Sequence, residues 1–211
     1  GYDLQKLSKG RFILGLGSQI RPHISKRFSM PWSSPAARMK EMIGAIRAIW
    51  DCWQNESSLN FKGEFYTHTL MTPMFNPGPN PYGVPKIYVA AVGPFMTKSV
   101  AESADGLLVH PFHTPKYMTE TTLPIVEESL ASVGKKRSDF DFSISVMTAT
   151  GLSEETYQKA IQAIKSGIAF YASTPAYKGV LEAHGYGDLQ GRLNLLSKEG
   201  KWGEMTTLID D

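Results

Sequence analysis

The feature that most constrains the fold is an apolar run, Lys86–Ala91, that leads through Gly93-Pro94 and a short helical stretch into a second run, Gly106–His110. Neither run alternates between apolar and polar residues, which is typical of parallel strands covered on both faces. The order predicts one βαβ unit. Ligands bind such units at the carboxyl ends of the strands, because backbone N–H groups at the start of the helix favour an anion. The sequence therefore predicts an anion site at the turn around Gly93.

Two more strands, Arg11–Leu16 and Phe142–Thr150, and several helices are predicted around this unit. The clearest helix begins at Ser34-Pro35, where proline suits the first turn, and runs to about Asn55 with an apolar stripe along one face. Other helices are expected over residues 115–133, 153–172, 176–183 and 189–196. The alternation of strands and helices predicts a parallel sheet whose strands are neighbours in chain order.

Residues 61–85 are expected to form an insertion between the first long helix and the strand that starts at Lys86. Phe61–Tyr66 has the pattern of a hairpin, and Pro73–Pro85 contains five prolines and two glycines without a regular pattern. A loop of this length within a compact domain is usually functional or disordered. Its aromatic residues and rigid prolines favour an ordered insertion or lid.

The composition argues against several classes of protein. The 211 residues include 22 basic and 20 acidic side chains, and this near balance argues against a nucleic-acid-binding surface. The one basic run, Lys135–Arg137, is interpreted as a solvated loop. No apolar run approaches about 18 residues, so no membrane span is expected. The single cysteine, Cys52, is interpreted as a structural thiol that forms no internal disulfide, which suits a cytoplasmic location.

Several segments together resemble the bacterial luciferase-like monooxygenase superfamily. Leu7–Ser18 is similar to the entry into strand four of that family. Arg47–Trp50 and then Phe61–Tyr66 are similar to its next helix and insertion hairpin, and Pro85–Gly106 to strands five and six with the cofactor-phosphate turn. The resemblance covers nearly the whole chain. It is greatest for the branch that uses a deazaflavin, coenzyme F-420 (8-hydroxy-5-deazaflavin).

This resemblance implies an α/β fold, the (β/α)8 TIM barrel of the luciferase-like type. Tyr2–Ser8 has the pattern of the last turns of a helix without a cap before it. We therefore expect a single domain over residues 1–211 that is a partial barrel, with strands four to seven, incomplete at both ends.

The resemblance also implies an oxidoreductase that uses the deazaflavin to move a hydride to or from a small organic substrate, with the cofactor supplying the chemistry. Two alternatives stay open: an FMN-dependent monooxygenase with the same fold, and a non-catalytic partial-barrel fragment. The full-length protein is expected to be a homo-oligomer with no nucleic-acid or membrane partner. The isolated chain is expected to self-associate through its open strand edges and inner face.

The same resemblance implies two groups of cofactor-binding residues. The turn after strand five is expected to cradle the phosphate and tail of the cofactor with Val92, Gly93, Pro94, Phe95 and Met96, since a glycine allows close approach of the backbone. A plain tight turn is the alternative. Ser18 and His23 follow strand four, and His23 is a candidate for cofactor contact and for proton transfer. The acidic catalyst of one branch corresponds to Ile20, so no catalytic residue is assigned, and Arg21 either pairs with an anion or lies on the surface.

Further histidines have a functional and a structural interpretation. His110 and His113 follow the second strand of the βαβ unit, where an imidazole can shuttle a proton near neutral pH. No carboxylate or cysteine accompanies this pair, so a metal site is not expected. His68, with the adjacent Thr69, either lines the mouth of the substrate site or has no role.

Three remaining features are interpreted as structural. Glu41 lies within the long helix and is expected to anchor a loop by an ion pair. Asp105 ends a helix before the strand at Gly106. Gly15-Leu16-Gly17 lacks the third glycine of a dinucleotide-binding fingerprint.

Overall fold

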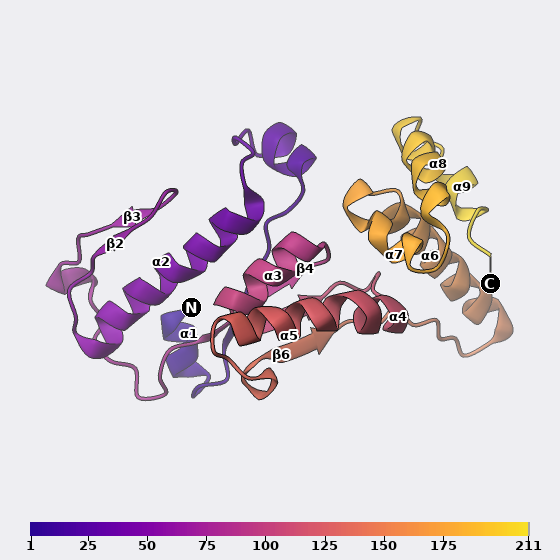
Figure 1. Ribbon diagram of the computed structural model, residues 1–211. Helices are drawn as coiled ribbons and strands as arrows, with labels where there is room; N and C mark the ends of the chain where they lie inside the picture. Colours follow the sequence, from indigo (N-terminus) through magenta and orange to yellow (C-terminus); the bar gives the residue numbers. More distant parts are fainter. Residues whose placement is uncertain (211) are drawn as a thin grey trace. The chain divides into compact units, whose positions relative to one another are not determined.

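The structure of the protein is a computed structural model, and it describes residues 1–210. These residues fall into two compact units, which are described one at a time (Figure 1). The first contains Gly1–Leu108 and Ile125–Ser143. The second contains Val109–Pro124 and the chain from Ile144 onward.

The first unit is built on a four-stranded sheet in the order β1-β4-β5-β6. Its strands are Ile13–Leu16, Lys86–Ala91, Gly106–Val109 and Asp141–Ile144. Strands β1 and β4 are parallel, with Ile13 opposite Lys86 and Leu16 opposite Val89. The predicted order of strands is confirmed. Ile87, Val89 and Leu107 have no exposed surface, as expected for strands covered by helices.

The prediction of a long fourth strand is wrong in its extent. The sequence predicted Phe142–Thr150, whereas β6 ends at Ile144. A strand needs a neighbour for its backbone hydrogen bonds, and β5 already ends at Val109, one residue before its predicted end. The apolar alternation continues past Ile144 to Val146, but the Val146 side chain is 75% exposed. Pattern alone therefore overestimated the length of this strand.

Helix α2, Pro35–Asn55, and helix α3, Pro94–Ser103, pack against each other in the first unit (Figure 1). The Ser99 hydroxyl donates to the Ala36 carbonyl oxygen at 2.8 Å, and Lys40 pairs with Glu102 at 2.6 Å. The predicted start and end of α2 are confirmed. Cys52 is buried, in agreement with its interpretation as a structural thiol.

The insertion is ordered and tied to the rest of the first unit. Its hairpin pairs β2, Phe61–Lys62, with β3, Thr67–His68, so it extends two residues beyond the predicted range. The loop that follows is bonded to helix α1, Tyr2–Leu7. The Tyr2 hydroxyl donates to the Gln54 and Gly78 oxygens, and the Asn80 amide donates to the Tyr2 carbonyl. These bonds fix a segment that has little secondary structure of its own.

Glu41 anchors the hairpin, but through different bonds from those predicted. Its carboxylate accepts the backbone N–H groups of Glu64, Phe65 and Tyr66 at 2.9, 2.7 and 2.7 Å. Burial raises the pKa of Glu41, yet these three donors and Arg38 outweigh it, so the pKa lies below its ordinary value. The expected ion pair is replaced by backbone donors, because the hairpin turn directs three N–H groups at one carboxylate.

The second unit is helical. It opens with α4, Pro115–Tyr117, and a π-helical turn, Met118–Thr122, whereas α5, Leu123–Ser132, belongs to the first unit from Ile125 onward. Its other helices are α6, Glu154–Ala172; α7, Lys178–Glu182; α8, Gly187–Lys198; and α9, Trp202–Thr206. Ser153 caps α6 by accepting the Thr156 N–H. The predicted helices are confirmed, and no helix of the described chain is long and apolar enough to cross a membrane.

Candidate functional site

The carboxyl edge of β1 and β4 is where the predicted cofactor residues lie. Leu16 is opposite Val89, and a Cβ added at Gly17 would lie 3.8 Å from the Cβ of Ala90, so the two strands stay side by side at this edge. Ser18 follows Gly17, and its hydroxyl donates to the Gln19 carbonyl at 3.2 Å. The structure thus brings Ser18 to the same edge of the sheet as the turn that follows β4.

Gly93 is the residue that caps the amino end of α3. Its carbonyl oxygen accepts the N–H and the hydroxyl of Thr97, both at 3.0 Å, which fixes the first turn of the helix. Pro94 has no N–H, and the N–H groups of Phe95 and Met96 lie in the first turn, where a helix offers no acceptor of its own. These two amides and the positive end of the helix are suited to an anion such as a phosphate.

Neither the backbone nor the packing requires a glycine at position 93. Its φ of −76° and ψ of 155° are extended values that any residue adopts. A Cβ built there would meet no atom within 4 Å. The Phe95 side chain beyond it is 84% exposed. The turn therefore has an open space beside Gly93 that no atom of the fold fills, and we call this space the open cradle at Gly93.

His23 begins a π-helical turn, His23–Arg27, in the segment between β1 and α2. Its side chain is half-buried, and within residues 1–210 its imidazole makes no hydrogen bond or ion pair. Arg21 is exposed. Both follow the carboxyl end of β1, as predicted, and contact with a cofactor stays a prediction.

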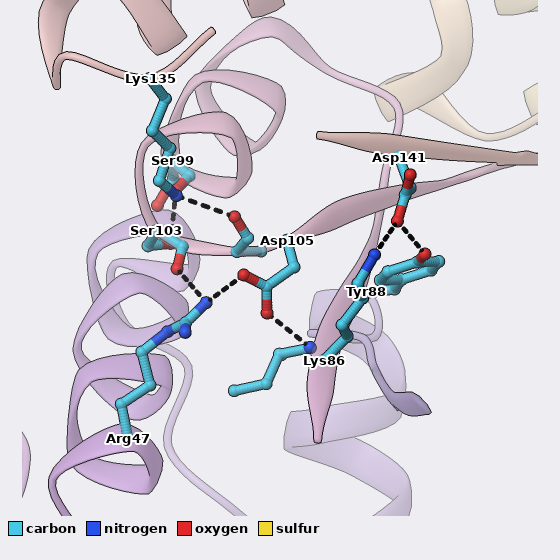
Figure 2. Close-up of polar contacts among 10 residues, drawn as sticks. Arg47, Lys86, Tyr88, Ser99, Ser103, Asp105, Lys135 and Asp141 are labelled. Atoms are coloured by element: carbon cyan, nitrogen blue, oxygen red, sulfur yellow. Dashed lines mark hydrogen bonds and ion pairs between the residues drawn. The ribbon is translucent and has the colours of Figure 1, made fainter. Parts of the chain in front are cut away.

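The amino edge of the same sheet carries a different set of side chains (Figure 2). Asp105 accepts the Ile87 N–H at 2.8 Å with one oxygen and binds Arg47 at 2.8 Å with the other. Asp141 accepts a 2.7 Å bond from Lys86 and a 2.5 Å bond from the Tyr88 hydroxyl. The structural interpretation of Asp105 is confirmed.

The charges of this amino edge satisfy one another. Burial, and then the bond to Asp141, raise the pKa of Tyr88 to about 12, so its hydroxyl stays protonated. The bonds from Lys86 and Tyr88 lower the pKa of Asp141, and the bond to Asp141 raises the pKa of Lys86. These groups hold one another in one charge state, which is the behaviour of a structural cluster.

His110 lies in the second unit, within a cluster of aromatic rings. Its Nδ1 accepts the Phe112 N–H at 3.2 Å, which leaves the proton of the neutral ring on Nε2. Its ring centroid lies 4.6 Å from that of Tyr171 and 4.8 Å from that of Tyr177. Burial lowers the pKa of His110, so the ring is neutral at neutral pH.

His113 lies in the same unit, 5.2 Å from the ring centroid of Tyr117. Both of its ring nitrogens are buried, and neither has a hydrogen-bond partner within the described chain. Burial, and then the neighbouring His110, lower the pKa of His113 to about 4. His184 Nε2 lies 2.7 Å from the Thr114 hydroxyl. No group of three or more potential metal ligands forms among residues 1–210.

His68 and Thr69 lie in the insertion. The His68 ring stacks on Tyr66 with centroids 6.5 Å apart. Thr69 lines a hollow of about 390 Å³ together with Cys52 at the carboxyl end of α2. A role at a substrate mouth stays a prediction.

Sequence reasoning missed the tyrosines around His110. Tyr171 lies in the last turn of α6 and Tyr177 follows the helix, and no local pattern links either to a loop some sixty residues earlier. It also missed Thr97 as the residue that fixes the Gly93 turn, although a threonine four residues after a glycine at a helix start is a usable signal.

Comparison with known proteins gives relatives that match along the whole chain. The chain is 55% identical over 211 residues to the uncharacterized protein Rv1360 of Mycobacterium tuberculosis. This match covers 100% of this chain and 62% of that protein. It is 28% identical over 214 residues to 5,10-methylenetetrahydromethanopterin reductase of Archaeoglobus fulgidus. This match covers 99% of this chain and 59% of the reductase. The chain thus spans about three fifths of the length of these relatives.

A solved structure gives the same fold. The coenzyme F-420-dependent tetrahydromethanopterin reductase from Methanopyrus kandleri superposes with a TM-score of 0.74 at 21% identity, over 100% of this chain and 61% of the other. The predicted fold class, an α/β barrel of the luciferase-like type of which this chain forms part, is confirmed. The family profile described as luciferase-like monooxygenase matches residues 2–211. The chain therefore belongs to the luciferase-like monooxygenase family.

Proposed function

We propose that the protein is an oxidoreductase that binds a deazaflavin, coenzyme F-420, at the carboxyl edge of β1 and β4. When bound, this cofactor supplies a hydride donor or acceptor for a small organic substrate. The names of two similar proteins support the cofactor class: the reductase from Methanopyrus kandleri and a glucose-6-phosphate dehydrogenase of Amycolatopsis mediterranei are both F-420-dependent. The second is 28% identical over 159 residues, which is 74% of this chain and 44% of that enzyme.

The observation that carries the proposal is the open cradle at Gly93. A glycine stands where neither the backbone angles nor any neighbouring atom needs one. It lies at the amino end of a ten-residue helix and at the carboxyl edge of a parallel sheet, which is where α/β proteins bind phosphates. The cofactor's phosphate is the group that we assign to this space.

Each residue of the turn has a role in this proposal. The N–H groups of Phe95 and Met96 donate to the phosphate, and the Ser18 hydroxyl becomes a further donor when it turns away from the Gln19 carbonyl. Thr97 holds the Gly93 carbonyl in the helix and so keeps it out of the anion site. Val92 and Pro94 set the direction of the chain as it enters the helix.

His110 is the candidate for proton transfer in the second unit. The Phe112 N–H occupies its Nδ1, so the neutral ring can only donate from Nε2. Burial among tyrosine rings keeps it neutral, so it would orient a substrate oxygen through its Nε2–H and could release a proton only after taking one up at Nδ1 in place of the Phe112 N–H. His23 is the alternative candidate and lies in the first unit.

The test is the affinity of the full-length protein for the deazaflavin, measured by fluorescence titration, in parent and Gly93→Val forms. Valine adopts the backbone angles of residue 93 without strain, so the variant is expected to fold as the parent does. A Cβ with two methyl groups fills the phosphate space, and we expect at least a tenfold loss of affinity, which is about 1.4 kcal/mol. Gly191→Val is the matched control, because a Cβ there also meets no atom within 4 Å.

Two results would overturn the proposal. If Gly93→Val binds the deazaflavin as tightly as the parent, the phosphate lies elsewhere. If the parent binds FMN and not the deazaflavin, the cofactor assignment is wrong and the monooxygenase alternative gains support.

A further inference from the structure

His113 lies in the loop between β5 and α4, and its imidazole is enclosed within the second unit. Both ring nitrogens are buried, and within residues 1–210 neither has a hydrogen-bond partner. Most buried polar side chains of folded proteins do have a partner, because an unpaired group loses the bonds that it would make with water. The His113 ring is therefore held in place by packing and not by its own polar atoms.

The packing around His113 joins this loop to α7. The His113 ring meets the Tyr117 ring edge-on, with centroids 5.2 Å apart. Tyr117 is buried, and a Cβ added at Gly179 of α7 would lie 3.4 Å from the Tyr117 hydroxyl oxygen. The hydroxyl of Thr114 lies 2.7 Å from Nε2 of His184, which follows α7. The loop is thus attached to the α7 region at two points.

No carboxylate is among the groups that act on the charge of His113 within the described chain. Burial lowers its pKa most, the charge of His110 lowers it further, and the backbone of His110 raises it by less, so the pKa falls from 6.5 to about 4. Glu182 of α7 acts on Tyr117, and its carboxylate pairs with Lys178 at 3.0 Å. The titratable groups of the segments around this loop are His110, Lys116, Tyr117, Tyr171, Tyr177, Lys178, Glu182 and His184.

A proton on His113 is compatible only with an open loop. A buried cation without a partner is strongly unfavourable, whereas a histidine in contact with water titrates near its ordinary pKa of 6.5. Because the pKa in the closed loop lies below this value, the closed loop is fully favoured above pH 6.5. It loses this advantage as the pH falls from 6.5 toward 4.

We propose that His113 is an acid-sensitive latch, which holds residues 110–114 against the α7 region when its ring is neutral and releases them when the ring is protonated. The same loop carries His110, whose ring centroid lies 4.6 Å from that of Tyr171 and 4.8 Å from that of Tyr177. Release of the loop withdraws His110 from these rings. The latch therefore takes this aromatic cluster apart in acid and restores it on return to neutral pH.

The latch is independent of the proposed function. All of its residues lie in the second unit, and it requires neither a cofactor nor an anion at Gly93. Its test accordingly uses the full-length protein without added ligand, and the result does not depend on whether a deazaflavin binds.

The experiment follows amide hydrogen exchange at pH 7 and pH 5 in the parent, His113→Phe and His113→Gln, whose new side chains take up no proton. The reporting amides are those of residues 113, 117 and 118, which donate within the loop and at the start of α4. From pH 7 to pH 5 we expect the parent's protection to fall roughly tenfold or more relative to each variant at the same pH. His68→Phe is the matched control in the first unit and should behave as the parent does.

A second measurement needs no variant at position 113. The His113 ring of the parent is titrated by NMR, and we expect it to become protonated only as the protection of the loop is lost. A ring that titrates near pH 6.5 while the loop stays protected would overturn the latch, because the charged ring would then be accommodated in the closed loop. An equal fall of protection in the parent and in both variants would also overturn it, since other groups would then open the loop. Protection in the parent that is the same at pH 7 and pH 5, relative to the variants, would do so as well.

Discussion

The two edges of one parallel sheet differ in how their polar groups are used. At the amino edge, Asp105 and Asp141 are each bonded to two partners, and Lys86 and Tyr88 point at the same carboxylate (Figure 2). At the carboxyl edge, a side chain added at Gly93, the residue that caps α3, would meet no atom within 4 Å. Barrels of this class place stability at the first edge and ligands at the second.

Gly106 at the amino edge and Gly93 at the carboxyl edge illustrate this difference. A Cβ at Gly106 would lie 2.8 Å from the Tyr88 ring and 2.9 Å from the Asp141 carbonyl oxygen, because the ring crosses Gly106 to reach Asp141. A Cβ at Gly93 would meet nothing. One glycine is needed by the fold, and the other has open space beside it.

The largest expected effect separates these two glycines. Gly106→Ala should lower the free energy of unfolding by about 2–3 kcal/mol, because the backbone or the Tyr88 ring must shift. Gly93→Ala should leave it unchanged or raise it by up to about 1 kcal/mol, because alanine restricts the unfolded chain and fits the extended angles. Urea unfolding of both variants checks this, and equal losses would contradict the contrast between the edges.

Removal of Asp105 should have the next largest effect. Asp105→Ala leaves the Ile87 N–H and Arg47 without their acceptor, at an expected cost of about 2 kcal/mol. Asp105→Asn keeps an oxygen for the N–H and should cost less. The ranking is read from the midpoints of urea unfolding. A harmless Asp105→Ala would mean that this edge is not held by its polar bonds.

Tyr88→Phe should cost about 1 kcal/mol through loss of the bond to Asp141. The pKa of Tyr88 is raised from 10.0 to about 12 in the folded chain. Its contribution is therefore complete below pH 10 and is lost as the pH rises toward 12. The unfolding free energy of the parent should fall more steeply than that of the variant over this range, and parallel curves would contradict the raised pKa.

The smallest effect is expected at Glu41. Its folded pKa is lowered, so its contribution is present above the unfolded pKa and is lost as the pH falls through the folded value. Glu41→Gln has a single oxygen for three backbone donors, which should loosen the hairpin while the sheet stays intact. Hydrogen exchange of the amides of residues 64–66 should become faster in the variant. Unchanged protection there would show that the hairpin is held by other contacts.

Local patterns predicted the parts of the molecule that depend on neighbours in sequence. The apolar runs gave the strands in their correct order, Ser34-Pro35 gave the start of α2, and Gly93-Pro94 gave the turn before α3. Parts that depend on distant partners were not predictable. The end of β6 is set by the short β5, and the bond between Tyr88 and Asp141 joins residues 53 positions apart.

The candidate site was likewise predictable where it depends on neighbours in sequence and not where it depends on distant residues. Glycine and proline at the end of a strand mark a turn whether or not a ligand binds there, and only the structure shows that a side chain at Gly93 would meet no atom. The tyrosines around His110 come from α6 and the turn after it, so the sequence around His110 gave no sign of them.

The most direct test of the account is a titration of the isotope-labelled, full-length protein with the deazaflavin, followed through its backbone amide resonances by NMR. The account predicts shifts at the carboxyl edge, at the amides of Ser18, Phe95 and Met96, and unchanged amides at Asp105, Gly106 and Asp141. Shifts confined to the amino edge, or no shift at Phe95 and Met96 once the protein is saturated, would contradict the assignment of the two edges.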